Sequence, residues 1–118
     1  MSTSTPQRFR VVRVGVTQVI EFDLPEDIEA MEFDAINTAL GLTIANAAGE
    51  RWVLDLAGAI YFGSALLGML VNVRAKVRKG RGALVLCNLS PAVDRVLRAG
   101  SMEKLFEIAG DRAAALGA

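Results

Sequence analysis

Residues 52–79 read WVLDLAGAIYFGSALLGMLVNVRAKVRK, and this stretch decides the fold of the chain. The apolar run WVLDL, interrupted only by Asp55, is typical of a strand that is covered on both faces. A turn punctuated by glycines follows, and Ser64 is expected to be the N-cap of a helix that continues to about Lys79. The stretch therefore predicts a strand-turn-helix unit that presents a serine hydroxyl where the helix begins.

The remaining elements are expected around this unit. A β-hairpin is predicted from the runs at 9–16 and 19–22, and Gly80 is expected to be the left-handed residue that ends the central helix. Ser90 and Pro91 form a favoured helix start. The other expectations are a first helix between 23 and 49, a strand at 83–88, a helix ending at Gly100, a short edge strand at 104–108 and a last helix at 111–116. Strands that alternate with helices predict one α/β domain with a central, mostly parallel β-sheet, an N-terminal hairpin and about four helices.

Composition narrows the class of protein. The chain has 118 residues, 53% of them hydrophobic and 22% charged, which is enough for one globular domain over residues 8–118, preceded by a flexible lead-in at 1–7. Thirteen basic residues balance thirteen acidic ones, so no basic field favours nucleic acid as a partner. A single cysteine, Cys87, suits a reducing cytoplasm. The apolar stretch 56–73 is broken by glycines and polar residues, so we expect no transmembrane segment.

The chain contains no histidine, which removes the usual general base near neutral pH and the commonest metal ligand. Ser64 also lacks the glycines that flank a hydrolase nucleophile on both sides. We therefore expect neither an enzyme, a cofactor nor a metal site, and Asp55 is interpreted as a satisfied polar residue at a strand end. Two readings of Ser64 remain: a plain N-cap, or a hydroxyl that accepts a phosphate, whose charge a helix N-terminus tolerates.

The helix after Ser64 carries two stripes at helical spacing. One stripe, Leu66, Leu70, Val73 and Val77, can pack on the sheet. The second is apolar at its start and basic at its end, which suits a groove with an acidic rim on a partner protein, although a neighbouring helix of the same domain could also cover it. This second stripe consists of Leu67, Val71, Arg74 and Arg78.

Several sequence blocks resemble the STAS domain family, in particular the bacterial anti-sigma factor antagonists. The blocks are WVLDL before the turn, FGSALLG at it, and CNLSPAVDRVL followed by AGSMEKLF. The resemblance covers nearly the whole chain. It implies a cytoplasmic, non-enzymatic regulator of bacterial transcription that binds a serine-kinase anti-sigma factor and is switched by phosphorylation of a serine at the start of the second helix.

That serine corresponds to Ser64 here, and we expect partner contacts at Gly63, Ser64 and the second stripe. The family turn usually reads Asp-Ser-Ser/Thr-Gly, whereas this chain has Gly63, Ser64, Ala65 and Leu66 at those positions. Family members with such departures also serve as constitutive scaffolds or as subunits of larger assemblies, of the stressosome or lipid-transport kind. Both functions stay open at this point, as does the oligomeric state, a homodimer included.

Overall fold

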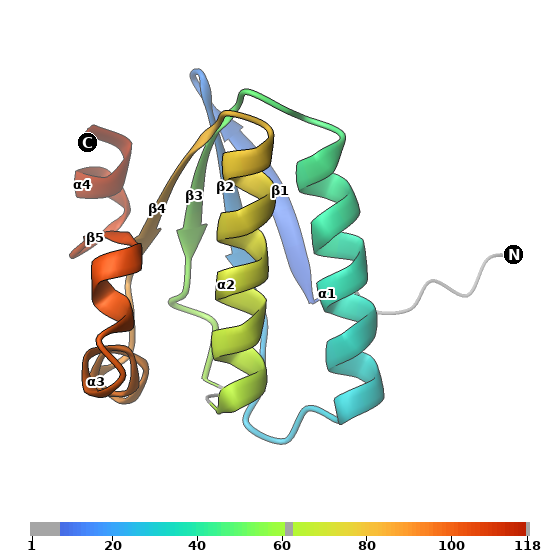
Figure 1. The fold of residues 1–118 in the computed structure, drawn as a ribbon, viewed down its shortest axis with the longest axis vertical. Coiled ribbons are helices and arrows are strands. Elements are labelled where there is room, and N and C mark those ends of the chain that lie inside the picture. The colour runs from blue at the N-terminus through green and yellow to red at the C-terminus, as the bar shows by residue number, and fades with distance from the viewer. Residues whose placement is uncertain (1–7, 61–62, 118) are drawn as a thin grey trace, which may run out of the picture.

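The structure is a computed structural model, and it describes residues 8–60 and 63–117. The lead-in at 1–7 that was expected to be flexible lies outside the described residues. The chain forms one five-stranded sheet in the order β1-β2-β3-β4-β5, in which only the β1–β2 pair is antiparallel (Figure 1). The strands are β1 (Phe9–Val14), β2 (Thr17–Phe22), β3 (Arg51–Asp55), β4 (Ala83–Cys87) and β5 (Glu107–Ala109).

The predicted hairpin is confirmed. Val14 pairs with Thr17, so that Gly15 and Val16 alone make the turn between β1 and β2. Gly15 has a φ of 61°, a backbone conformation that glycine adopts without steric strain. The turn thus fixes which residues of β1 face each side of the sheet.

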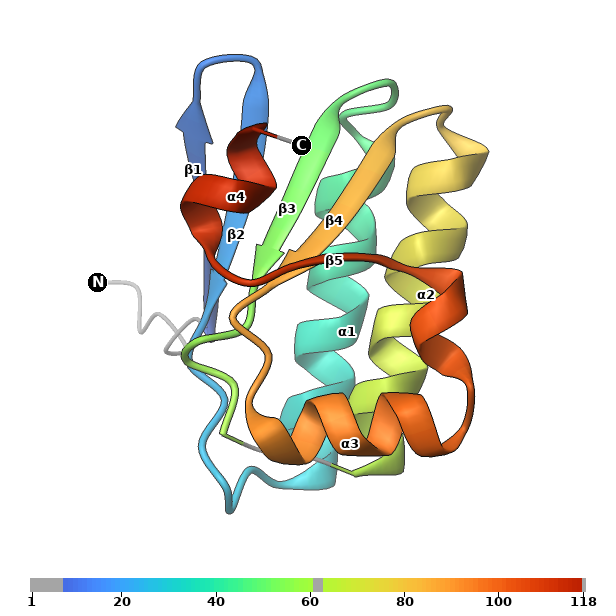
Figure 2. The ribbon, with the colours of Figure 1, turned by 90° about the vertical axis from the view of Figure 1, so that its left-hand side faces the viewer.

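Two long helices cover one face of the sheet. They are α1 (Ala30–Ala45) and α2 (Ser64–Lys79), and Figure 2 shows them side by side behind the strands. The helix α3 (Pro91–Ala99) adds Val93 and Leu97 to the same core, and a short 3-10 helix, η1 (Met102–Leu105), follows it. The last helix, α4 (Arg112–Gly117), packs on the opposite face against β3, β4 and β5.

The central strand β3 is buried on both sides, as its sequence predicts. Trp52 and Leu54 belong to the main core beneath α1 and α2, whereas Val53 lies in a second, smaller cluster that includes Ala115 of α4. The core stripe predicted for α2 is also confirmed, since its four residues are buried together with Met69. Burial of apolar side chains of this kind, summed over the domain, is the dominant favourable term in folding.

The end of α2 differs from the expectation at Gly80. This residue has a φ of −84°, and the left-handed residue is Arg81, with a φ of 62°. The N–H of Arg81 donates to the carbonyl of Arg78 at 3.0 Å, and that of Gly82 to Val77 at 2.9 Å. These two hydrogen bonds define a Schellman motif whose left-handed position falls one residue later than predicted.

The boundaries of two other elements also differ from the predicted ones. The first helix begins only at Ala30, because the acidic residues before it form the loop after β2, and it ends at Ala45, four residues before Gly49. The edge strand expected at 104–108 is shifted to β5 at 107–109, since η1 occupies 102–105 and the Phe106 N–H closes its last turn on Glu103. Within the described ranges, no helix is both long enough and apolar enough to cross a membrane.

Candidate functional site

The carboxyl ends of the parallel strands meet at one edge of the sheet, where α/β proteins commonly place their functional loops. The loop after β2 and the loop after β3 lie together there: the Leu24 N–H donates to the Gly58 carbonyl, and the Ile60 N–H to the Leu24 carbonyl, both at 2.9 Å. Gly58 is required at this contact, because an added Cβ would lie 2.0 Å from the Phe22 carbonyl oxygen. The paired loops lead directly to Ser64.

Ser64 is exposed and is the first residue of α2, not its cap. Gly63 occupies the N-cap position, with a φ of 157° and a ψ of −178°, and no side chain caps the helix. That backbone region is open almost only to glycine, which explains why the predicted N-cap role of Ser64 is wrong. The Ser64 hydroxyl forms no hydrogen bond with any described residue, so it is free at the positive end of the helix dipole.

The second stripe of α2 does not form one uniform surface. Val71 is 39% exposed and Arg78 is exposed, whereas Leu67 is half-buried against the main core. Arg74 is also half-buried, and its Nε donates to the Leu105 carbonyl at 2.7 Å. Half of the predicted docking stripe therefore contacts the domain itself.

The surface that α2 does expose shares Ser64, Val71 and Arg78 with the predicted contact residues, but its Gly68 and Ala75 were missed in the sequence. It begins with small residues at a spacing of three or four along the helix and ends at a long basic side chain: Ser64, Gly68, Val71, Ala75 and Arg78. A Cβ placed on Gly68 would meet nothing within 4 Å, so the fold does not require glycine there. A spacing of three or four residues between small exposed side chains is the signal that could have identified this surface.

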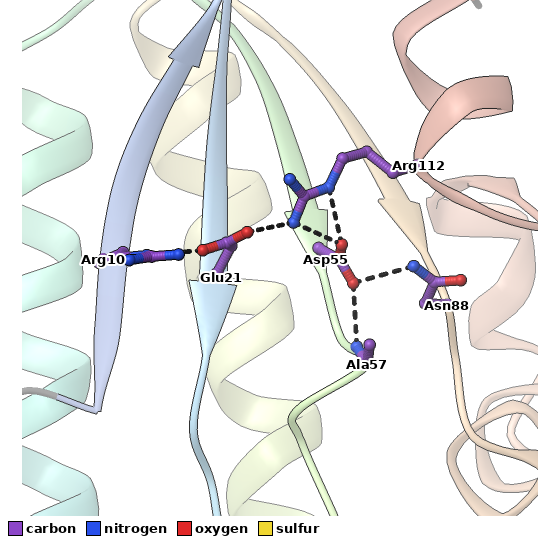
Figure 3. Close-up of polar contacts among 6 residues, drawn as sticks. All are labelled: Arg10, Glu21, Asp55, Ala57, Asn88 and Arg112. Atoms are coloured by element: carbon purple, nitrogen blue, oxygen red, sulfur yellow. Dashed lines mark hydrogen bonds and ion pairs between the residues drawn. The ribbon is translucent and has the colours of Figure 1, made fainter.

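Asp55 organises the polar groups behind this edge (Figure 3). Its Oδ1 accepts hydrogen bonds from the Ala57 N–H and the Asn88 Nδ2, each at 3.0 Å, and its Oδ2 accepts from Arg112. The side chain is buried, so its interpretation as a satisfied polar residue at a strand end is confirmed. One carboxylate thereby ties together the loop after β3, the loop after β4 and the start of α4.

Arg112 extends the network to the N-terminal hairpin. It donates to Glu21 on β2 as well as to Asp55, and Glu21 in turn accepts from Arg10 of β1 at 2.6 Å. Sequence reasoning missed these three residues, since they lie far apart along the chain and share no motif. Their arrangement explains how α4 is held across the strands.

The hydrogen bonds of the network stabilise the charged forms of Asp55 and Glu21. Burial by itself raises the pKa of Asp55, but hydrogen bonds from Asn88, Ala57 and Arg112 outweigh it and hold that pKa below its ordinary value. Hydrogen bonds from Arg112 and Arg10 likewise lower the pKa of Glu21. A carboxylate whose oxygens are all occupied is a poor general base, so the geometry of this network suits the positioning of the loops.

The other candidate reactive groups are inert or absent in this part of the molecule. Cys87 is buried, and burial raises the pKa of its thiol to about 11, so the nucleophilic thiolate is scarce. Among the described residues, no group of acidic and cysteine side chains is arranged to hold a metal ion. What remains at this edge is an exposed hydroxyl beside an exposed helix surface.

Comparison with known proteins agrees with the fold described above. A profile of the STAS domain matches residues 11–115. The chain is 38% identical over 69 residues to BtrV of Bordetella bronchiseptica, which is described as an anti-sigma factor antagonist; the match covers 58% of this chain and 60% of BtrV. The chain thus spans less than two thirds of the curated relatives it matches.

Solved structures share the fold at low sequence identity. An anti-sigma factor antagonist (STAS) domain protein from Planctomyces limnophilus superposes with a TM-score of 0.78 at 23% identity, over 92% of this chain and 96% of the other. SpoIIAA of Bacillus in its phosphorylated form superposes with a TM-score of 0.63 at 18% identity, over 86% and 90% of the two chains. At these identities the likeness establishes the fold alone.

Proposed function

Because the chain belongs to the STAS domain family, we propose that it is a non-enzymatic, anti-sigma factor antagonist-like regulator that binds a serine-kinase anti-sigma factor and is switched at Ser64. The observation that carries this proposal is the free Ser64 hydroxyl at the start of α2, next to a helix surface that the domain leaves open. A kinase must reach the acceptor oxygen, and here no described side chain occupies it.

The proposed contact surface consists of Gly63, Ser64, Gly68, Val71 and Arg78, with Leu67 and Arg74 supporting it from partly buried positions. Glycine in the interior of an exposed helix is unfavourable by roughly 0.5–1 kcal/mol relative to alanine. Since no described residue lies within 4 Å of the missing Cβ of Gly68, close approach of a partner backbone is a physical reason for glycine there.

Phosphorylation would change this surface in a defined way. The phosphate would carry nearly two negative charges, which the free N–H groups of the first turn of α2 could stabilise. A partner packed on Ser64 would have to desolvate that charge, so we expect its affinity to fall. The switch would act at the contact surface without unfolding the domain.

The test is incubation with a purified serine-kinase anti-sigma factor of the same organism and ATP. Mass spectrometry should find one phosphate, at Ser64, that the Ser64→Ala variant lacks. Val71→Asp should weaken binding at least tenfold, whereas Leu42→Asp, a matched change at an exposed apolar residue of α1, should not. Equal binding by both variants would contradict the proposed surface.

A second function is favoured by the turn itself. Gly63 replaces the aspartate of the family turn, and its backbone conformation is one that an aspartate would not adopt without strain. A kinase that recognises that carboxylate would not find it. If Ser64 stays unmodified while Val71→Asp still abolishes binding, the protein is a constitutive interaction subunit of a larger assembly, in which Ser64 has no switching role.

A further inference from the structure

The charges of this chain are balanced in number but separated in space. The sequence from 14 to 50 contains eight of the thirteen acidic residues and no lysine or arginine, whereas 74–81 contains five basic residues and no acidic one. The first segment includes the loop before α1, and the second forms the end of α2. Figures 1 and 2 both place that loop and that helix end at opposite ends of the long helices.

At one end, four carboxylates are exposed and form no ion pair with another described residue. They lie in the loop after β2 and in the first turns of α1, beside the loop that leads to Ser64, and they are Glu26, Asp27, Glu29 and Asp34. Arg8 lies nearby, but it forms ion pairs with Asp23 and Glu32 and not with these four carboxylates. We call this surface the acidic end.

At the other end, four cations are likewise without an ion pair to any residue that the structure describes. They are Lys76, Arg78, Lys79 and Arg81, in the last turn of α2 and the turn after it, and we call them the basic end. Glu50 pairs with Arg13 at 3.1 Å, so it does not neutralise them. A helix of 16 residues is about 24 Å long, well beyond the Debye length of roughly 8 Å at physiological salt. Salt therefore screens the charges of one end from those of the other within the same molecule.

The helix dipoles explain the sign of the charges at each end of the domain but not the number of charges there. Both helices begin at the acidic end and finish at the basic end, so each set of charges complements the dipole nearest to it. That role needs only charges within the first or last turn. Seven exposed charges and the half-buried Lys76 still have no ion-pair partner among the described residues, and a domain of zero net charge offers no overall repulsion between copies.

We propose that copies of this chain associate head to tail, with the basic end of one copy on the acidic end of the next. The two surfaces are different and complementary, which makes the contact heterologous, so it can repeat along a row of copies. Exposed ion pairs are individually weak, and the association is therefore weak, concentration-dependent and sensitive to salt. It covers the edge that carries Ser64 and so competes with any partner that docks there, whether or not Ser64 is modified.

Sedimentation of the full chain tests this proposal. At about 0.01 M salt, where the Debye length is about 30 Å, the average mass should rise with concentration, and at about 1 M salt, where it is about 3 Å, the protein should be monomeric. A wild-type protein that stays monomeric at low salt would overturn the proposal.

Two charge-reversed variants make the test specific. Arg78→Glu with Lys79→Glu cancels the positive charge of the basic end, and Glu26→Lys with Asp27→Lys cancels the negative charge of the acidic end, so each variant alone should be monomeric. An equimolar mixture should associate again, because each variant supplies the end that the other lacks. Failure of the mixture to associate, with both variants folded by circular dichroism, would refute head-to-tail docking.

A third variant controls for net charge. Arg95→Glu with Lys104→Glu changes the net charge as much as reversal of Arg78 and Lys79, at exposed positions outside the basic end. This variant should keep the salt-sensitive association. If this variant loses the association as fully as the variant with Arg78 and Lys79 reversed, then net charge, and not the two opposite ends, controls self-association. That result would overturn the proposal.

Discussion

The carboxylate of Asp55 binds the guanidinium of Arg112 through one hydrogen bond, from Nε to Oδ2 at 2.9 Å, and through an ion pair between Nη2 and Oδ2 at 2.8 Å. The two residues are 57 positions apart and join the central strand to the last helix. Only 8% of the Asp55 side chain is exposed, against 33% for Arg112, so the pair lies at the boundary between core and solvent. This contact holds α4 over the second apolar cluster.

The first prediction concerns that pair. Arg112→Met should lower the free energy of unfolding by about 1–3 kcal/mol, because it leaves a buried carboxylate with fewer hydrogen bonds. Arg10→Met is the matched control: its ion pair with Glu21 is largely exposed on the arginine side and should contribute less than about 1 kcal/mol. Urea denaturation measures both, and similar losses for the two variants would argue against a special role for Arg112.

The second prediction concerns pH. Asp55 and Glu21 both have pKa values in the folded state that lie below their ordinary values. Such groups stabilise the fold above their unfolded pKa values of about 4, and this contribution is lost as the pH falls through the lower folded values. The free energy of unfolding should therefore drop on acidification from about pH 5 downward. The drop should be shallower in Arg112→Met; an identical pH profile would mean that other carboxylates cause it.

The third prediction compares two serines at helix starts. Ser90 is a true N-cap, since its hydroxyl accepts from the Val93 N–H at 3.2 Å, and Ser90→Ala should reduce stability by about 1 kcal/mol. Ser64 makes no such bond, so Ser64→Ala should change stability by less than about 0.5 kcal/mol. Chemical denaturation distinguishes the two, and a large loss for Ser64→Ala would show that its hydroxyl caps α2 in solution.

The fourth prediction compares two glycines. Gly68→Ala should raise the free energy of unfolding by roughly 0.5–1 kcal/mol, because it improves helix propensity and meets no neighbouring atom. Gly58→Ala should destabilise the domain instead, since its Cβ would collide with the Phe22 carbonyl. Thermal unfolding should show shifts of opposite sign. If Gly68→Ala is also more stable but binds its partner less well, the glycine serves the interface and not the fold.

Local pattern determined much of this protein. The apolar run at 52–54, the helical stripe of α2 and the Ser90–Pro91 start each depend on neighbours within one element, so sequence spacing was sufficient to predict strand, helix and cap. Ser64 was correctly placed where α2 begins. The same reasoning assigned it the cap because serine is a common N-cap residue, and the local sequence did not reveal the backbone angles of Gly63.

Only the tertiary structure decided which surfaces remain open and which polar groups meet. Leu67 and Arg74 were assigned to a docking stripe by helical spacing, but their exposure depends on η1 and on the main core, which pack against them from elsewhere in the chain. Asp55, Glu21 and Arg112 come together because parallel strands bring their ends to one edge and α4 begins beside those ends. Helical and strand periodicity describe contacts within an element, whereas contacts between distant segments arise only when the elements pack.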